Sequence, residues 1–166
     1  MNQNNVKLRR YEDDLNVGGF GIIMLGAWTV LKLFMQILAH AKEAFNLEEF
    51  KDYDKTVLFI AYAIVVVLLA LLALLVFWLH LYIGLNAMRA AKGQAYNKGY
   101  FVWSVILLVL VALGLFSYKE SIKDLSKIDT TIASLIVDLT TIYVLGTIVT
   151  ATRKIKGLKS KEQERE

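Results

Sequence analysis

Four long runs of apolar residues, separated by short charged segments, constrain the fold more than any other feature of this chain. A helix needs about 20 predominantly apolar residues to cross a bilayer, and each run reaches or approaches that length. The chain is also 57% hydrophobic, above the roughly 45–50% that is usual for soluble domains. We therefore predict an all-α polytopic membrane protein, a four-helix transmembrane bundle. The predicted spans are residues 17–40, 57–84, 100–117 and 130–152.

The chain contains no proline, and proline commonly kinks membrane helices, so unbroken helices are the simplest expectation. The second span has 28 residues. It would reach about 42 Å at a 1.5 Å rise, against a hydrocarbon core of about 30 Å. We expect it to tilt strongly or to project beyond the membrane. Its outer two-thirds are nearly all Val, Leu, Ala and Phe, which predicts a lipid-facing helix.

The positions of Lys and Arg predict the orientation, because cytoplasmic loops carry an excess of both. They concentrate in residues 1–16, 85–99 and 153–166, whereas the connector 41–56 is net acidic and the connector 118–129 is balanced. Four spans place the three basic regions on one side, so both termini are predicted to be cytoplasmic. The location predicted is the bacterial cytoplasmic membrane. The predicted parts are a cytoplasmic N-terminal segment (1–16), the transmembrane domain (17–152) and a basic cytoplasmic tail (153–166).

Three local features of the sequence qualify this topology. The "AHA" at 39–41 resembles a signal-peptide cleavage site, but the apolar region is too long and acidic residues precede it, which disfavours cleavage. The two outer connectors carry apolar residues at helix-like intervals, so they form small interfacial helices or solvated loops. The tail either frays or continues the fourth helix briefly.

Two opposite charges lie inside the predicted spans. Lys32 precedes His40, at the outer end of the first span, by eight residues, or about 12 Å along a helix. Asp138 follows Asp129, at the outer end of the fourth span, by nine residues, or about 13 to 14 Å. A charge at the centre of a membrane helix costs at least about 2.5–3.5 kcal/mol and usually pairs inside a bundle. We therefore predict an intramembrane ion pair between Lys32 and Asp138.

Two other interpretations of these charges stay open. The pair could form between two subunits rather than within one. Alternatively, Lys32 extends its long side chain toward the headgroups, and burial keeps Asp138 protonated and uncharged.

The fourth span is more polar than the second and third, and its polar residues form two stripes. Gln36 lies one turn after Lys32 on the same face of the first span. One stripe of the fourth span surrounds Asp138 and either lines a path or packs against protein. Its members are Thr131 (or Thr130), Ser134, Asp138 and Thr141. The neighbouring stripe consists of Thr140, Tyr143, Thr147 and Thr150.

Small and aromatic residues mark two further features. Glycines at the start of the first span favour close packing against another helix, with a flexible hinge as the alternative. These glycines are Gly18, Gly19, Gly21 and Gly26. Trp78, His80 and Tyr82 lie in the last third of the second span, where amphipathic rings predict anchors at the membrane interface.

The sequence carries no catalytic motif, no cysteine and no paired histidines for a metal, so we expect neither an enzyme nor a cofactor. The net charge of +4 arises in juxtamembrane Lys and Arg, and we expect no nucleic-acid partner. The leading hypothesis is a small integral membrane protein that acts through helix–helix association, as a homo-oligomer or an accessory subunit of a membrane complex. The alternative is an oligomeric ion channel or proton-coupled transporter, with the fourth span lining the path and Asp138 as the ion or proton site.

Overall fold

The computed structural model describes residues 3–44, 55–118 and 128–163. Within these ranges the secondary structure is helical. The elements are α1 (Gln3–Ala44), α2 (Lys55–Ala91), α3 (Gly99–Gly114), the 3₁₀ turn η1 (Leu115–Ser117) and α5 (Ile128–Gln163). Among the described residues, four helices are long and apolar enough to cross a membrane, which confirms the all-α architecture with four candidate spans. The predictions for the two outer connectors fall largely outside the described residues.

Two helices extend well beyond the predicted spans. α1 begins at Gln3 and α5 continues to Gln163, so the end segments predicted as separate parts are helical continuations. Leu8, Tyr11 and Leu15 recur at helical intervals in α1 and pack in the core cluster that includes Ile155 of α5. This apolar stripe stabilises the helices past the membrane-length segments, so the tail is not frayed up to Gln163.

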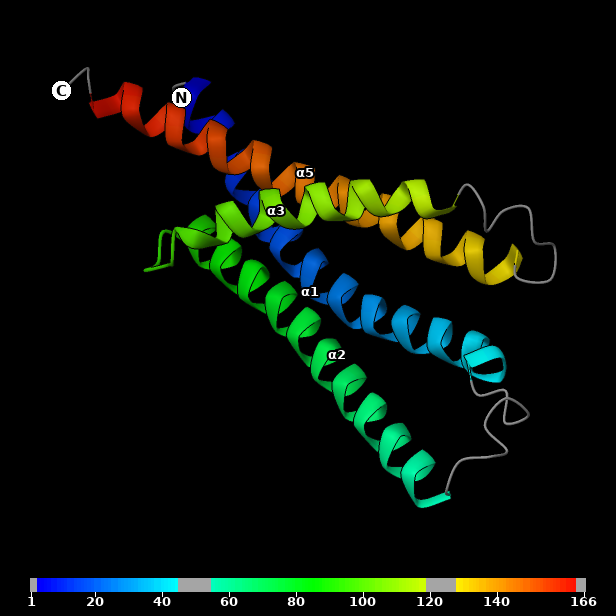
Figure 1. The fold of residues 1–166 in the computed structure, drawn as a ribbon. Coiled ribbons are helices and arrows are strands. Elements are labelled where there is room, and N and C mark those ends of the chain that lie inside the picture. Colours follow the sequence, from blue (N-terminus) through cyan, green and yellow to red (C-terminus); the bar gives the residue numbers. More distant parts are fainter. Residues whose placement is uncertain (1–2, 45–54, 119–127, 164–166) are drawn as a thin grey trace.

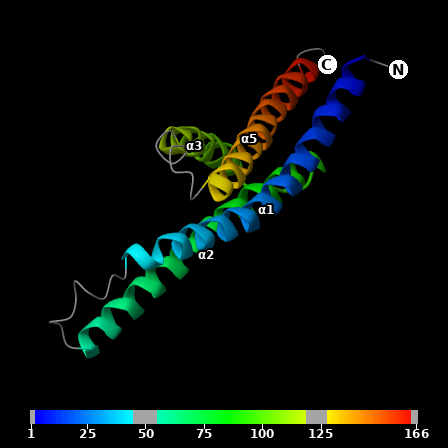
Figure 2. The same ribbon diagram turned by 90° about the vertical axis from the view of Figure 1, so that its right-hand side faces the viewer.

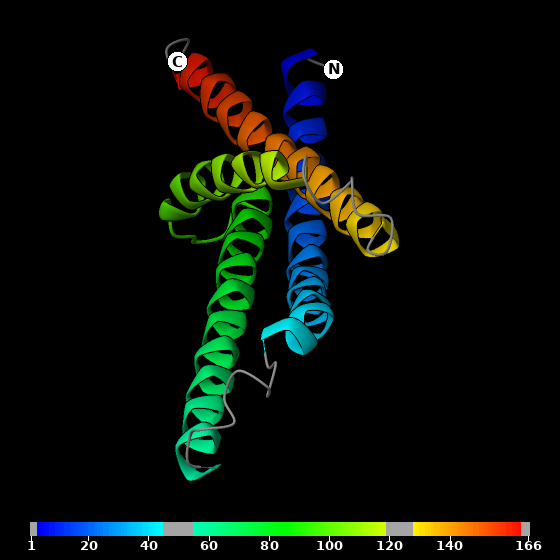
Figure 3. The same cartoon turned by 45° about the vertical axis from the view of Figure 1, so that its right-hand side comes forward.

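The helices meet near the end of the molecule that carries both termini and spread toward the other end (Figure 1). α1 lies between α2 and α5, and α3 lies along α5. In the view of Figure 3, α1 and α2 run side by side, while α3 passes across the end of α2 and reaches α5. Figure 2 shows how far the N-terminal half of α2 departs from α5. No described side chain of residues 56–79 is buried within the chain, so this half of α2 is left largely exposed.

The crossing of α1 and α2 is built on glycine. A Cβ atom on Gly19 would lie 2.8 Å from the Gly84 carbonyl oxygen and 2.8 Å from Cγ of Met88. A Cβ atom on Gly84 would in turn collide with the Gly19 carbonyl oxygen and with Ile23. The two backbones therefore approach closely enough to exclude any side chain, which is the small-residue packing mode of membrane helices.

A tight turn joins α2 to α3. Gly93 has φ +67°, and its N–H donates to the Ala90 carbonyl while the Gln94 N–H donates to the Arg89 carbonyl. This pattern is a Schellman C-cap, which needs a left-handed residue and so favours glycine. The Asn97 N–H then donates to the side-chain oxygen of Asn86 at 2.8 Å. The turn is thus fixed to the end of α2 and sets the direction in which α3 begins.

Candidate functional site

The structure brings Lys32 and Asp138 together on the seam between α1 and α5. The Lys32 Nζ atom lies 2.6 Å from Oδ1 and 2.7 Å from Oδ2 of Asp138. Asp138 as a residue is 8% exposed. Both carboxylate oxygens therefore accept a charge-assisted hydrogen bond, and the contact is made between two helices of one chain.

Tyr118 completes the cluster, and the sequence analysis did not identify it. Its hydroxyl donates a hydrogen bond of 2.6 Å to Oδ2 of Asp138. The Lys32 Nζ atom lies 5.6 Å from the centre of the Tyr118 ring, within range of a cation–π contact. Ser134, one turn before Asp138 on α5, is buried as well. The ammonium, the carboxylate and the phenol therefore satisfy one another in a largely buried place.

Counting residues from the inner ends of the spans, rather than from the outer ends, would have placed Tyr118 close to the depth of Asp138. Measured from the outer ends of the spans, Tyr118 lies at the outer end of its own span, whereas Asp138 lies much deeper. α3 is shorter than α5, however, and α5 extends past the end of α3 (Figure 1). Measured from the inner ends at Tyr100 and Thr152, Tyr118 lies about 27 Å away and Asp138 about 21 Å away. The two side chains can therefore meet.

The polar stripe around Asp138 faces protein. Thr131, Ser134 and Thr141 are all buried within the chain, and the Thr141 hydroxyl donates to the Val137 carbonyl at 2.7 Å. The neighbouring stripe points outward. Tyr143 is 75% exposed, and the Thr140 and Thr147 hydroxyls donate to the Ile136 and Tyr143 carbonyls of the same helix. The side chain of Gln36 lies outside the described part of the structure.

The four glycines predicted to pack do so to different degrees. Gly19 packs on α2 as described above, and a Cβ atom on Gly26 would lie 2.5 Å from the Cβ atom of His80. A Cβ atom on Gly18 would lie 3.0 Å from the Ile148 side chain of α5, whereas one on Gly21 would meet Val144 at an ordinary 3.5 Å. These contacts favour packing over a hinge at the start of the first span.

His80 was predicted as an interface anchor, and that part of the prediction is wrong. His80 is 1% exposed because Gly26 lets α1 close over its ring. Its Nδ1 atom lies 2.8 Å from the Val76 carbonyl oxygen, and its buried Nε2 atom has no hydrogen-bond partner among the described residues. Trp78, by contrast, is exposed and stacks on Tyr82 with ring centres 5.7 Å apart. The anchor roles of Trp78 and Tyr82 stay predictions.

The Lys32–Asp138–Tyr118 cluster is a hydrogen-bonded contact between α1, α5 and the residue that follows η1. Three hydrogen bonds from Lys32 and Tyr118 occupy the carboxylate. Within residues 3–44, 55–118 and 128–163, no three His, Asp or Glu side chains come together as a metal site. Comparison of the chain with models of protein families, with curated proteins and with solved structures finds no match.

Proposed function

We propose that this chain is a small integral membrane protein of the bacterial cytoplasmic membrane that acts through association of its helices with a second copy of itself. Support for the membrane comes from four helices of suitable length and apolarity. Support for cytoplasmic termini comes from the basic regions, which the sequence places in residues 1–16, 85–99 and 153–166, and from the position of both termini at one end (Figure 1).

The observation that carries the proposal is the outward position of Tyr143. This side chain is 75% exposed and lies nine residues before Thr152, about 13 to 14 Å along the helix from the inner end of the predicted span. A phenol that faces hydrocarbon there has no partner for its hydroxyl, and a polar group without a hydrogen bond in an apolar medium is costly. A protein surface that covers Tyr143 removes this cost.

The surroundings of Tyr143 suit a helix–helix contact. Thr140, Thr147 and Thr150 lie on the same face of α5, and a Cβ atom on Gly146 would meet nothing within 4 Å. Small and hydroxyl-bearing residues are enriched where membrane helices approach closely. The exposed half of α2 is mostly aliphatic instead, and lipid tails cover such a surface as well as protein does. The α5 face, not α2, therefore supports the proposal.

The transport interpretation has weaker support. A path along α5 needs a hydrated stripe around Asp138, whereas Thr131, Ser134 and Thr141 are buried with it inside the chain. The carboxylate that would bind an ion already accepts hydrogen bonds from Lys32 and Tyr118. Asp138 thus fits a packing role better than that of an ion or proton site.

The test uses disulfide cross-linking in native membranes, which is clean because the sequence contains no cysteine. Tyr143→Cys should form a dimer on mild oxidation. Leu110→Cys is the matched control, because Leu110 is 57% exposed at a similar distance from the inner end of α3, about 15 Å. It should stay monomeric. Gly146→Leu, added to Tyr143→Cys, should abolish the dimer by blocking close approach, while Gly114→Leu should leave it.

Two results would contradict self-association through this face. In the first, Tyr143→Cys stays monomeric on oxidation. In the second, Tyr143→Cys and Leu110→Cys give equal yields of dimer. A discrete product of Tyr143→Cys with a different protein would instead support the accessory-subunit form of the association hypothesis and contradict the homo-oligomer.

A further inference from the structure

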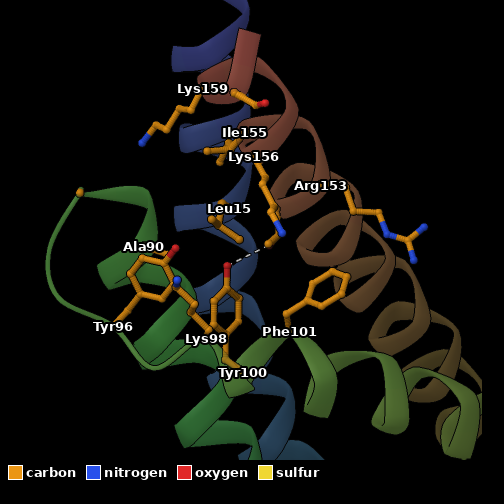
Figure 4. A pocket seen from close by; sticks show the side chains of 13 residues that line it. Leu15, Ala90, Tyr96, Lys98, Tyr100, Phe101, Arg153, Ile155, Lys156 and Lys159 are labelled. Atoms are coloured by element: carbon orange, nitrogen blue, oxygen red, sulfur yellow. Dashed lines mark hydrogen bonds between the residues drawn. The ribbon is translucent and has the colours of Figure 1, made fainter. Parts of the chain in front are cut away.

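A cavity of about 700 Å³ opens at the end of the molecule that carries both termini. Its walls come from the turn that precedes α3, from the first residues of α3 and from the last part of α5. Figure 4 shows Tyr96, Lys98 and Tyr100 on one wall and Lys156 and Lys159 on the other. Leu15 of α1 lies between the two walls, so three separate parts of the chain build the cavity.

The lining of this cavity is strongly basic. Its thirteen residues include Lys98, Arg153, Lys156 and Lys159 and no Asp or Glu. Lys159 also has a long contact of 3.6 Å with Glu12, outside the lining. Lysine and arginine are the side chains that bind phosphate oxygens, through charge-assisted hydrogen bonds. The excess of basic over acidic residues in the lining therefore predicts an anionic ligand.

The rest of the lining is aromatic and hydroxyl-bearing. The Tyr100 and Thr152 hydroxyls are hydrogen-bonded at 2.9 Å, and the Tyr96 and Tyr100 rings meet edge to face with centres 5.8 Å apart. The Arg153 guanidinium lies 5.7 Å from the centre of the Phe101 ring. These contacts hold the wall in place, and the apolar part of the lining suits a ligand that has an apolar part as well.

The cavity lies where the apolar parts of two helices end. The apolar run of α3 starts immediately after Gly99, and the apolar run of α5 ends immediately before Arg153. In a membrane, this boundary is the level of the lipid phosphates. Basic pockets between membrane helices on the cytoplasmic side suit anionic headgroups.

We propose that the cavity binds the phosphodiester headgroup of an anionic phospholipid from the inner leaflet. Lys98 and Lys156 contact the phosphate from opposite walls, and an acyl chain follows the apolar surface toward the bilayer centre. The proposal rests on membrane insertion with the termini in the cytoplasm. It is independent of self-association through Tyr143, which lies on another face of α5.

The experiment measures the thermal unfolding temperature of the purified full chain in a non-ionic detergent. Phosphatidylglycerol, phosphatidylcholine and inorganic phosphate are added separately. Two variants lose the same charge: Lys98→Gln/Lys156→Gln removes two lining cations, and Lys154→Gln/Lys161→Gln removes two exposed cations of α5 that do not line the cavity. Because cysteine cross-linking at Tyr143 is a separate readout, failure here and failure of the association proposal are distinguishable.

Phosphatidylglycerol should raise the unfolding temperature at low concentration, and phosphatidylcholine should not. The lining variant should need roughly tenfold or more phosphatidylglycerol for the same rise, while the exposed variant should match the parent. An equal loss in both variants would overturn the proposal in favour of unspecific surface attraction. A full rise with inorganic phosphate alone would overturn the lipid assignment and make a soluble phosphate the ligand.

Discussion

Asp138 is a carboxylate in an apolar helix, and its neighbours explain how it is kept there. Lys32 supplies the opposite charge and Tyr118 a second donor. Removing one of these groups should destabilise the fold by more than the net stabilisation that its contact provides. The partner that remains is then buried without a hydrogen bond and without its hydration. The cluster is therefore best understood as a unit whose members depend on one another.

Removing the hydrogen bond of Tyr118 is the mildest test of this cluster. Tyr118→Phe keeps the buried ring and removes only the hydroxyl that donates to Asp138. We expect a loss of about 1.5 to 3 kcal/mol in the free energy of unfolding, the range for a hydrogen bond to a charged group, measured by thermal unfolding in detergent. Tyr96→Phe is the control, since it removes a hydroxyl from a half-exposed ring, and it should leave stability unchanged. Equal effects of the two changes would contradict the assigned role of Tyr118.

The sequence predicted two of the three members of this cluster. Lys32 and Asp138 are the opposite charges in the middle of otherwise apolar runs, and counting residues from the outer ends placed them at one depth. Tyr118 was missed because that count assumes helices that end at one level. The outer end of α5 extends past the outer end of α3, and this difference depends on packing rather than on hydropathy. The burial of His80 was missed for a related reason, because it depends on Gly26 from a distant part of the chain.

At the scale of the element, the α1–α2 crossing depends on the absence of side chains at two positions. Gly84→Ala should destabilise the protein by about 1 to 3 kcal/mol, the usual cost of overpacking, because the new methyl group meets the Gly19 carbonyl oxygen and Ile23. Gly114→Ala is the matched control within α3, where a Cβ atom meets nothing within 4 Å, and it should unfold at the parental temperature or slightly above it.

Thermal unfolding in the same detergent checks the comparison. A Gly84→Ala variant as stable as Gly114→Ala would contradict the close approach of α1 and α2.

Hydropathy alone located the four elements, and the glycines indicated that α1 packs closely. The continuation of α1 to Gln3 was not predicted, and that of α5 was predicted only as a brief alternative to fraying, because both end segments are charged overall. The stripe of Leu8, Tyr11 and Leu15 was present in the sequence, but its partner Ile155 lies on another helix.

At the scale of the whole molecule, the chain consists of two helical pairs that meet mainly between α1 and α5 and, to a smaller extent, between α2 and α3. α1 packs with α2, α3 packs with α5, and α1 connects the two pairs through α5 (Figure 1). The Lys32–Asp138 contact lies on the seam between α1 and α5. Apolar composition specifies which segments are suited to enter the membrane but is nearly uniform along α2 and α3. Specific polar contacts and glycines therefore decide which helices meet.

The most direct test of this account is a double-mutant cycle across the seam. It compares the free energy of unfolding of the parent, Lys32→Met, Asp138→Asn and the double variant, in detergent or nanodiscs. Each single change should destabilise by about 3 to 5 kcal/mol, because it leaves a buried charge without its partner. The double variant should recover at least about 1 kcal/mol of the summed loss. If Asp138→Asn is instead neutral or stabilising whether or not Lys32 is present, the pair does not hold the helices together, and the packing role of Asp138 is contradicted.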